Sequence, residues 1–221
     1  MKKNIVIIGS VGHARVVIDA VEKQGIYKII GLIDDFRSPG ERTFGYDVMG
    51  KVEDFAVLIE KFKIDGCFIA IGDNWSRKIV HDKITSNNIN IEFITVIHPS
   101  AQIGRNVTIN KGAVLMAGAI INSNSNVGNF SIINTKASID HDCFIGNFAS
   151  LAPNVTLGGY VKVGDYTAIS MSATLKNSIE IGEHCVIGAG ALVLNNVENN
   201  KIVYGIPAKV IRERHAGEQY L

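Results

Sequence analysis

The sequence has few cysteines, almost no net charge and no long apolar segment. A net charge of +1 over 221 residues offers no basic excess to bind nucleic acid or a membrane surface. No apolar run approaches the roughly 18 residues that cross a membrane, and the apolar start breaks at Gly9 and Gly12, which favours a strand over a signal peptide. Three cysteines without metal-ligand spacing suit reduced thiols in a cytoplasm. We therefore expect a cytoplasmic protein that binds neither nucleic acid nor membrane.

The sequence does contain a strict period of six residues. Seventeen six-residue repeats run from residue 97 to residue 198 without an insertion. The first position is always aliphatic, from Ile97 to Val193, and the fifth is small or β-branched, from Ala101 to Val197. One large and one small inward residue per six is typical of a parallel β-helix. Three repeats form one coil, so residues 18 apart are predicted to stack.

Residues 1–96 lack this period and alternate apolar runs with helical patterns. Strands are predicted at residues 4–9, 27–34, 66–72 and 91–97, helices at 12–24 and 76–86, and a loop or edge hairpin at 36–50. This order indicates a small parallel α/β domain. The predicted domains are 1–96, the β-helix at 97–200, and a C-terminal cap at 201–221 with a short helix at 210–212.

Three loops of the α/β domain are predicted to meet at one edge of its sheet. The turn after the first strand opens a helix, whose free N–H groups can receive phosphate oxygens. The second strand ends in two aspartates, where dinucleotide folds place a carboxylate for ribose. The turn lacks the third glycine of the full motif, so alone it fits an ordinary strand–helix connection equally well. Together the loops favour a nucleotide or nucleotide-sugar site made of Ser10, Gly12, His13, Asp34, Asp35 and Gly72.

His141 is the candidate catalytic residue of the β-helix. It occupies the third position of its repeat and is predicted to point outward, between Asp140 and Asp142. The residue 18 positions later is Gly159, which leaves open space beside the imidazole. This pattern suits a general base, whose pKa can lie near neutrality. A solvated surface histidine is the simpler alternative.

Neither a cysteine nucleophile nor a metal site is expected. Cys143 and Cys185 occupy inward fifth positions and Cys67 lies in a strand, whereas reactive thiolates need exposure. The other histidines of the repeats, His98 and His184, fall on different faces from His141, so a three-histidine zinc cluster is not predicted.

The whole chain resembles the family of sugar acetyltransferases that includes sialic acid O-acetyltransferases and UDP-N-acetylbacillosamine-type and GDP-perosamine N-acetyltransferases. The resemblance rests on residues 9–14 (GSVGHA), 34–35 (DD), 70–74 (AIGDN), 98–101 (HPSA), 133–135 (INT), 140–143 (DHDC) and 205–209 (GIPAK). It implies a Rossmann-like nucleotide-sugar domain followed by a left-handed parallel β-helix. It also implies a homotrimer that binds acetyl-CoA in the groove between two prisms.

The resemblance further assigns residues. It implies that His141 is the general base, that Asp142 orients it, and that Gly159, Met171 and Ala189 line the coenzyme groove. Many members have a second histidine near the thioester, nine residues after the base; here that position is Ser150, whose hydroxyl can donate a hydrogen bond.

The predicted activity is acetyl-CoA-dependent N-acetylation of a nucleotide-linked 4-amino-4,6-dideoxy sugar. Two alternatives stay open, O-acetylation of a sialic-acid-type sugar and a non-catalytic trimeric scaffold that binds a nucleotide sugar. The sequence does not encode which nucleotide is bound.

Overall fold

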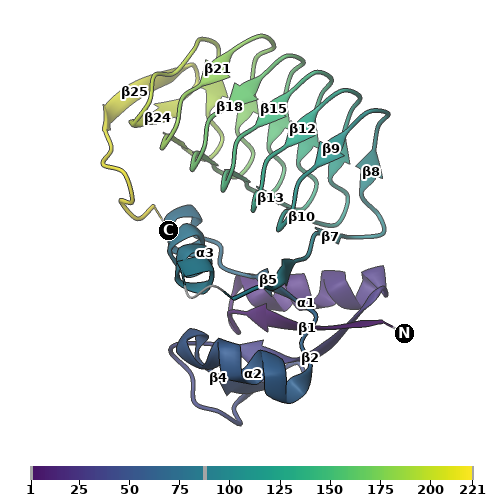
Figure 1. Ribbon diagram of the computed structural model, residues 1–221. Coiled ribbons are helices and arrows are strands. Elements are labelled where there is room, and N and C mark those ends of the chain that lie inside the picture. The colour runs from purple at the N-terminus through teal and green to yellow at the C-terminus, as the bar shows by residue number, and fades with distance from the viewer. Residues whose placement is uncertain (1, 87–88, 221) are drawn as a thin grey trace.

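The computed structural model describes residues 2–86 and 89–220. The chain forms two domains with different folds. A small α/β domain lies against one side of a long three-sided β-helix (Figure 1). The chain passes from the first into the second near residue 96, where the first strand of the β-helix begins.

The α/β domain is built on a six-stranded sheet in the order β3-β4-β2-β1-β5-β6. All neighbours are parallel except the β3–β4 hairpin. Strands of such a sheet are covered on both faces and therefore read as continuous apolar runs; Ile5–Ile8 is buried throughout. The strands are β1 (Lys3–Ile8), β2 (Tyr27–Ile33), β3 (Arg42–Thr43), β4 (Tyr46–Gly50), β5 (Gly66–Ile69) and β6 (Glu92–Phe93).

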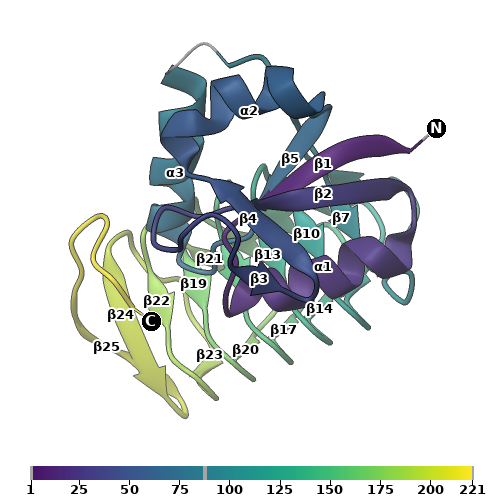
Figure 2. The same ribbon diagram turned by 90° about the horizontal axis from the view of Figure 1, so that it is seen from below.

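Helices cover both faces of this sheet. α1 (His13–Gln24) lies between the sheet and the β-helix, and α2 (Phe55–Phe62) and α3 (Asn74–Ser86) cover the opposite face, preceded by the short helix η1 (Val52–Asp54) (Figure 2). α1 ends at Gly25, whose positive φ of 74° closes the helix. Across the described ranges, no helix is long and apolar enough to cross a membrane.

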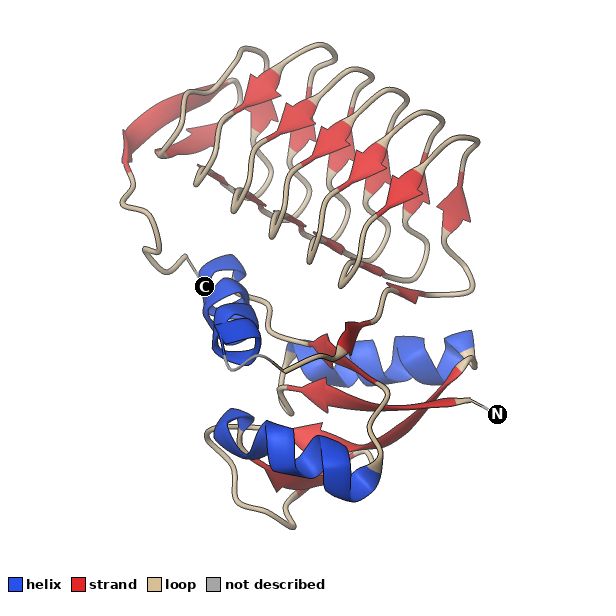
Figure 3. Ribbon diagram, viewed as in Figure 1, coloured by secondary structure: helices blue, strands red, loops and turns tan. Residues whose placement is uncertain are grey.

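The β-helix has three sheets whose strands have two residues each, except the longer β24 and β25 at its end, and turns at three corners separate the sheets (Figure 3). The first prism sheet contains β7 (Val96–Ile97), β10 (Val114–Leu115), β13 (Ile132–Ile133), β16 (Ser150–Leu151), β19 (Ala168–Ile169), β22 (Val186–Ile187), β24 (Lys201–Gly205) and β25 (Ala208–Glu213). The second contains β8 (Gln102–Ile103), β11 (Ile120–Ile121), β14 (Ser138–Ile139), β17 (Thr156–Leu157), β20 (Thr174–Leu175) and β23 (Leu192–Val193). The third contains β9 (Thr108–Ile109), β12 (Asn126–Val127), β15 (Phe144–Ile145), β18 (Lys162–Val163) and β21 (Glu180–Ile181).

The bore of the prism follows the six-residue period. Residues 18 apart pair in register, as Ile121 does with Ile139, and the aliphatic and small positions form one buried core. Where the small position is polar, its hydroxyl bonds to the neighbouring backbone: Ser131 Oγ donates to the carbonyl oxygens of Gly128 and Gly146 at 2.8 Å each. The stacking predicted from the sequence is therefore confirmed.

The short helix predicted at residues 210–212 was wrong. These residues lie in β25, which pairs antiparallel with β24 and extends the first prism sheet. Gly205 has a φ of 107°, which lets the chain reverse direction after β24. Pairing with the open edge of β24 satisfies the backbone of both strands, which a short isolated helix would not achieve.

Candidate functional site

The predicted crevice exists at the carboxyl edge of the α/β sheet. It is a cavity of about 580 Å³ lined by residues from three loops, from α3 and from the C-terminal segment. Of the predicted residues, Ser10, His13, Asp34, Asp35 and Gly72 line it together. Gly12 forms the N-cap of α1 beside them, with a φ of 54° and open space where a Cβ would be.

Asp34 fixes the turn at the base of this crevice. Its carboxylate accepts the Ser10 hydroxyl at 2.5 Å and the Phe36 backbone N–H at 2.9 Å. The Thr43 hydroxyl donates to the Ser10 carbonyl at 2.8 Å, so the β3–β4 hairpin supports the same turn. The free lone pairs of the carboxylate can still accept a ligand hydroxyl.

Asp35 is engaged differently from its neighbour. It accepts the backbone N–H of Val52 at 2.8 Å and lies 3.0 Å from the Lys83 ammonium. Although it lines the cavity, its two oxygens hold η1 and α3 in place. Its contacts indicate a supporting role for the crevice wall.

His13 presents a neutral imidazole to the crevice. Burial, with the nearby Arg77 cation, lowers the pKa of His13 to about 4. Its Nε2 atom is buried without a hydrogen-bond partner. A buried polar atom without a partner is costly, so a ligand that reaches this atom gains a hydrogen bond at little desolvation cost.

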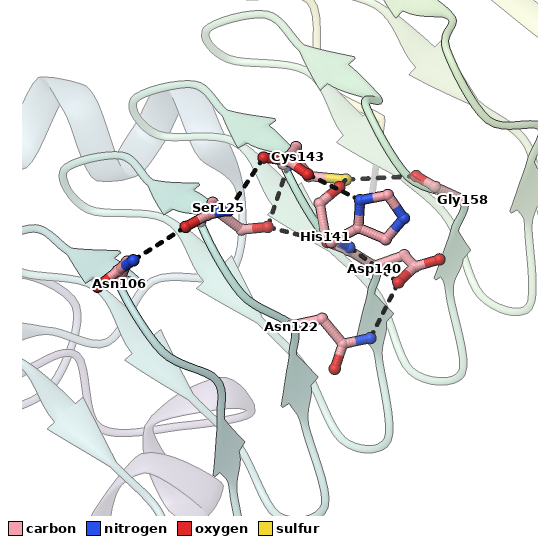
Figure 4. Close-up of polar contacts among 9 residues, drawn as sticks. Asn106, Asn122, Ser125, Asp140, His141, Cys143 and Gly158 are labelled. Carbon is pink, nitrogen blue, oxygen red and sulfur yellow. Dashed lines mark hydrogen bonds and ion pairs between the residues drawn. The ribbon is translucent and has the colours of Figure 1, made fainter.

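The second candidate centre is His141, on the corner between the second and third prism sheets (Figure 4). Its Nδ1 lies 2.8 Å from Asp142 Oδ2, and its side chain is 48% exposed. The carboxylate can only accept, so Nδ1 carries the proton and Nε2 offers the basic lone pair. The hydrogen bond with Asp142, supported by the charge of Asp140, raises the pKa of His141.

A ladder of amide side chains holds Asp142 in place. Asn124 Nδ2 donates to Asp142 Oδ1 at 3.3 Å, and Asn106 Nδ2 donates to Asn124 Oδ1 at 3.2 Å. All three residues have positive φ values, between 57° and 62°. Asn and Asp tolerate this left-handed backbone better than most residues. One coil below Asp140, Asn122 likewise donates to that carboxylate at 3.0 Å.

Gly159 provides the space predicted beside the imidazole. A Cβ at this position would lie 2.8 Å from both Cε1 and Nε2 of His141. The ring of Tyr160 stands edge-on to the imidazole at 5.1 Å. The absence of a side chain at Gly159 therefore leaves room for Cε1 and Nε2 of the half-exposed His141 ring.

The predicted coenzyme residues do not gather at one place in a single chain. Gly159 lies under His141, whereas Met171 and Ala189 follow β19 and β22 on the corner between the first and second prism sheets, both exposed. Ser150 lies in β16 of the first prism sheet, and its hydroxyl is 3.5 Å from that of Tyr220. Within the described part of the chain, no three His, Cys, Asp or Glu side chains could hold a metal ion.

Comparisons with known proteins identify the two domains that carry these centres. The PglD N-terminal domain family model matches residues 4–84, and the bacterial transferase hexapeptide model matches residues 91–135. A mutant of perosamine N-acetyltransferase from Caulobacter crescentus, in complex with CoA and GDP-perosamine, is 32% identical, with a TM-score of 0.89 over 95% of this chain and 97% of that one. The chain belongs to the PglD-type sugar N-acetyltransferases.

Other relatives support the same family. The acetyltransferase domain of PglB from Neisseria gonorrhoeae, in complex with acetyl coenzyme A, is 26% identical, with a TM-score of 0.84 over 96% of this chain and all of that one. UDP-N-acetylbacillosamine N-acetyltransferase of Bacillus subtilis is 31% identical over 115 residues, 51% of either chain. The chain spans 19% and 51% of the lengths of the two curated relatives that it matches. The predicted fold class, a Rossmann-like domain and a left-handed β-helix, is confirmed by these relatives.

The sequence did not indicate the contact that joins the two domains of this chain. Arg77 of α3 is 1% exposed, and its guanidinium donates to the carbonyl oxygens of Phe130 at 2.8 Å and Phe148 at 3.0 Å. It also donates to the carbonyls of Ile71 and Gly72, at 2.7 and 3.0 Å, on the crevice loop. One buried cation thus joins the β-helix to the crevice.

A column of aromatic rings on the corner between the third and first prism sheets packs against α3. The column consists of Phe130, Phe148, Tyr166 and His184, 18 residues apart, with neighbouring ring centroids 4.7–5.6 Å apart and rings nearly parallel. Trp75 and His81 of α3 pack edge-on or tilted against these rings. The 18-residue spacing of aromatic residues was the sequence signal that could have located this contact.

Proposed function

We propose that this protein transfers the acetyl group of acetyl-CoA to the 4-amino group of a nucleotide-linked 4-amino-4,6-dideoxy sugar. The observation that carries the proposal is the exposed His141–Asp142 pair over Gly159, whose Nε2 is free to take a proton. The crevice lined by Ser10 and His13 supplies a place for the nucleotide. Relatives that bind GDP-perosamine or are named for UDP-N-acetylbacillosamine support an amino sugar as the acceptor.

His141 acts as the general base in this proposal. The neutral amine attacks the thioester carbonyl, and Nε2 accepts a proton from the amine as the C–N bond forms. When the C–S bond then breaks, the imidazolium returns this proton to the sulfur, so that coenzyme A leaves as the thiol and His141 is neutral again. Asp142 stabilises the imidazolium that results, since its carboxylate accepts the Nδ1 proton at 2.8 Å. A positioned base contributes about 10²–10⁴-fold to the rate, and holding both substrates in line contributes several kcal/mol more.

The proposal needs a second copy of the chain. The α/β domain packs on the first prism sheet through α1, whereas His141 lies on the corner opposite that sheet. A sugar held in the crevice of one subunit therefore reaches the His141 of a neighbour. In the expected homotrimer, acetyl-CoA lies between two prisms against Gly159, Met171 and Ala189, with Ser150 available as a hydrogen-bond donor.

O-acetylation of a sialic-acid-type sugar is the closest rival. Free sialic acids have no diphosphate, so the turn at the start of α1 would have no phosphate to bind. A hydroxyl acceptor would also depend more strongly on the base than an amine does. A non-catalytic scaffold that binds a nucleotide sugar is the alternative from a different class. Such a scaffold would not require the exposed His141–Asp142 pair beside Gly159.

Acetyl transfer to a panel of UDP-, GDP- and dTDP-linked 4-amino-4,6-dideoxy sugars, followed by thiol release, tests the proposal. The matching hydroxy sugars and free sialic acid complete the panel. Rapid turnover of one amino sugar is the expected result. Turnover of a hydroxy sugar or sialic acid alone would favour O-acetylation, and binding of a nucleotide sugar without binding of coenzyme would favour the scaffold.

A further inference from the structure

The C-terminal segment beyond β25 returns from the end of the prism to the α/β domain (Figure 1). Arg214 anchors its first half: it is 4% exposed, its Nη1 donates to the His184 carbonyl at 3.0 Å, and its guanidinium lies 5.1 Å from the centre of the Tyr220 ring. Arg212 pairs with Glu218 at 2.6 Å and closes the turn between them. The segment is thus bound to the prism through charged groups.

The second half of the segment is fixed against the start of α3. Gly217 has a φ of 80°, and a Cβ there would lie 2.7 Å from Trp75 Nε1, so glycine permits the close approach. The Tyr220 hydroxyl accepts the backbone N–H of Asn74 at 3.2 Å. The segment is therefore held on both sides of residue 219.

Gln219 is the residue that these anchors direct toward the crevice. Its side chain is exposed and lines the cavity together with Gly72 and Ser76. Among the described residues that line the cavity, it alone comes from the C-terminal segment. A primary amide both donates and accepts hydrogen bonds without carrying charge.

We propose that Gln219 contacts the sugar-diphosphate end of the bound nucleotide sugar and contributes to its affinity. This inference rests on the proposed function, because it assigns a further residue to the same crevice. The Gln219 amide itself carries no charge that would repel the diphosphate, and its N–H groups can donate to a phosphate oxygen or a sugar hydroxyl.

The position of Gln219 within the crevice selects this end of the ligand. Part of the cavity lining is apolar, with Ile33, Val52 and Val80, and suits the flat base of a nucleotide. Gln219 instead lies at the side facing the prism, since its neighbour Tyr220 reaches Ser150 of the first prism sheet. Because the apolar residues suit the base, the polar side chain of Gln219 is left for the sugar-diphosphate end.

Binding of fragments to the Gln219→Ala variant tests the contact. Calorimetry with UMP, GMP and dTMP, with UDP, GDP and dTDP, and with the accepted nucleotide amino sugar separates base, diphosphate and sugar. We expect the dissociation constant of the nucleotide sugar to rise about three- to tenfold, the effect of one neutral hydrogen bond. Monophosphate affinity and the KM for acetyl-CoA should stay unchanged, and the diphosphates show whether phosphate or sugar is contacted.

Two further variants make the result decisive. His215→Ala removes another exposed side chain of the same segment, away from the crevice lining, and should bind like the wild type. Gly217→Ala displaces the segment from Trp75, the single tryptophan, so its emission should change while nucleotide-sugar affinity falls. Unchanged nucleotide-sugar affinity in Gln219→Ala, or an equal loss for the monophosphates, would overturn the inference while leaving the proposed function intact. A wild-type protein that binds no nucleotide would overturn both.

Discussion

In the β-helix, the place of a residue in the six-residue period decides which way its side chain points, whereas in the α/β domain no such period exists. His141 points outward because it is third in its repeat, and its partner Asp142 is the next residue along the chain. The crevice instead collects residues from positions 8–13, 33–36, 52, 70–80 and 219. A hydrogen-bonded histidine–aspartate pair can thus be local in sequence, while a cavity is assembled by tertiary packing.

The strongest test of this difference is His141→Ala. Because the side chain is exposed and outside the bore, we expect turnover to fall about 10²–10⁴-fold with little change in stability. Thiol release measures turnover, and circular dichroism and coenzyme binding monitor folding. Turnover close to that of the wild type would exclude His141 as the base.

Arg77→Ala should instead destabilise the molecule. The substitution leaves several buried carbonyl oxygens without a donor, so we expect the free energy of unfolding to fall by about 3 kcal/mol or more. Denaturant unfolding followed by Trp75 fluorescence measures the change. Lys78→Ala, which removes a partly exposed cation that pairs with Asp82 on the same helix, is the control and should change stability by less than about 1 kcal/mol.

Gly159→Ala tests the space beside the imidazole. The added Cβ would lie 2.8 Å from two ring atoms, so the ring must move. We expect kcat to fall about tenfold, since misplacing a catalytic group by an ångström can cost up to about 100-fold. Ser123→Ala, at the corner one coil below His141, should keep its activity. Equal activity of Gly159→Ala and the wild type would mean that the observed ring position is not required.

Asp142→Asn separates the charge of the partner from its geometry. Asparagine tolerates the positive φ of 57°, but the loss of the carboxylate removes the main cause that raises the pKa of His141. A base must be neutral to work, so activity falls as the pH drops through this pKa. The acidic limb of the kcat/KM profile should therefore move to lower pH in the variant, with a lower plateau. An unchanged limb would assign that limb to another group.

The smallest effect is expected for Cys143→Ala. The thiol is 2% exposed, donates to the Gly158 carbonyl at 3.3 Å, and has its pKa raised by burial. Activity should stay within about twofold of the wild type, because a buried thiol is a poor nucleophile. Loss of activity with intact folding would reopen an acyl-cysteine mechanism.

The sequence predicted most of the β-helix because each coil repeats the same constraint. It also predicted β1, β2, β5, α1 and α3 to within a few residues, since their apolar runs are long. It did not indicate α2, a helix of only eight residues that follows directly on η1. The helix predicted at 210–212 failed because local composition does not contain the open edge of β24 that makes β25 a strand.

The candidate site was predictable in parts. Spacing alone brought His141 and Gly159 together, because 18 residues make one coil. The roles of Arg77 and Gln219 depend on contacts across more than 50 and 100 residues, respectively, that no local pattern encodes. The 18-residue spacing of the aromatic residues could have predicted the column of rings. No pattern in the sequence indicated that α3 packs against it.

The stacked coils also limit how this enzyme family can change its dimensions. Adding or removing 18 residues below His141 would move the imidazole along the prism by one strand spacing, about 4.8 Å, and keep it on the same corner. Any shorter insertion within a strand would turn it toward another face. The distance between the corner that carries His141 and the α/β domain can therefore change only in whole steps of one strand spacing.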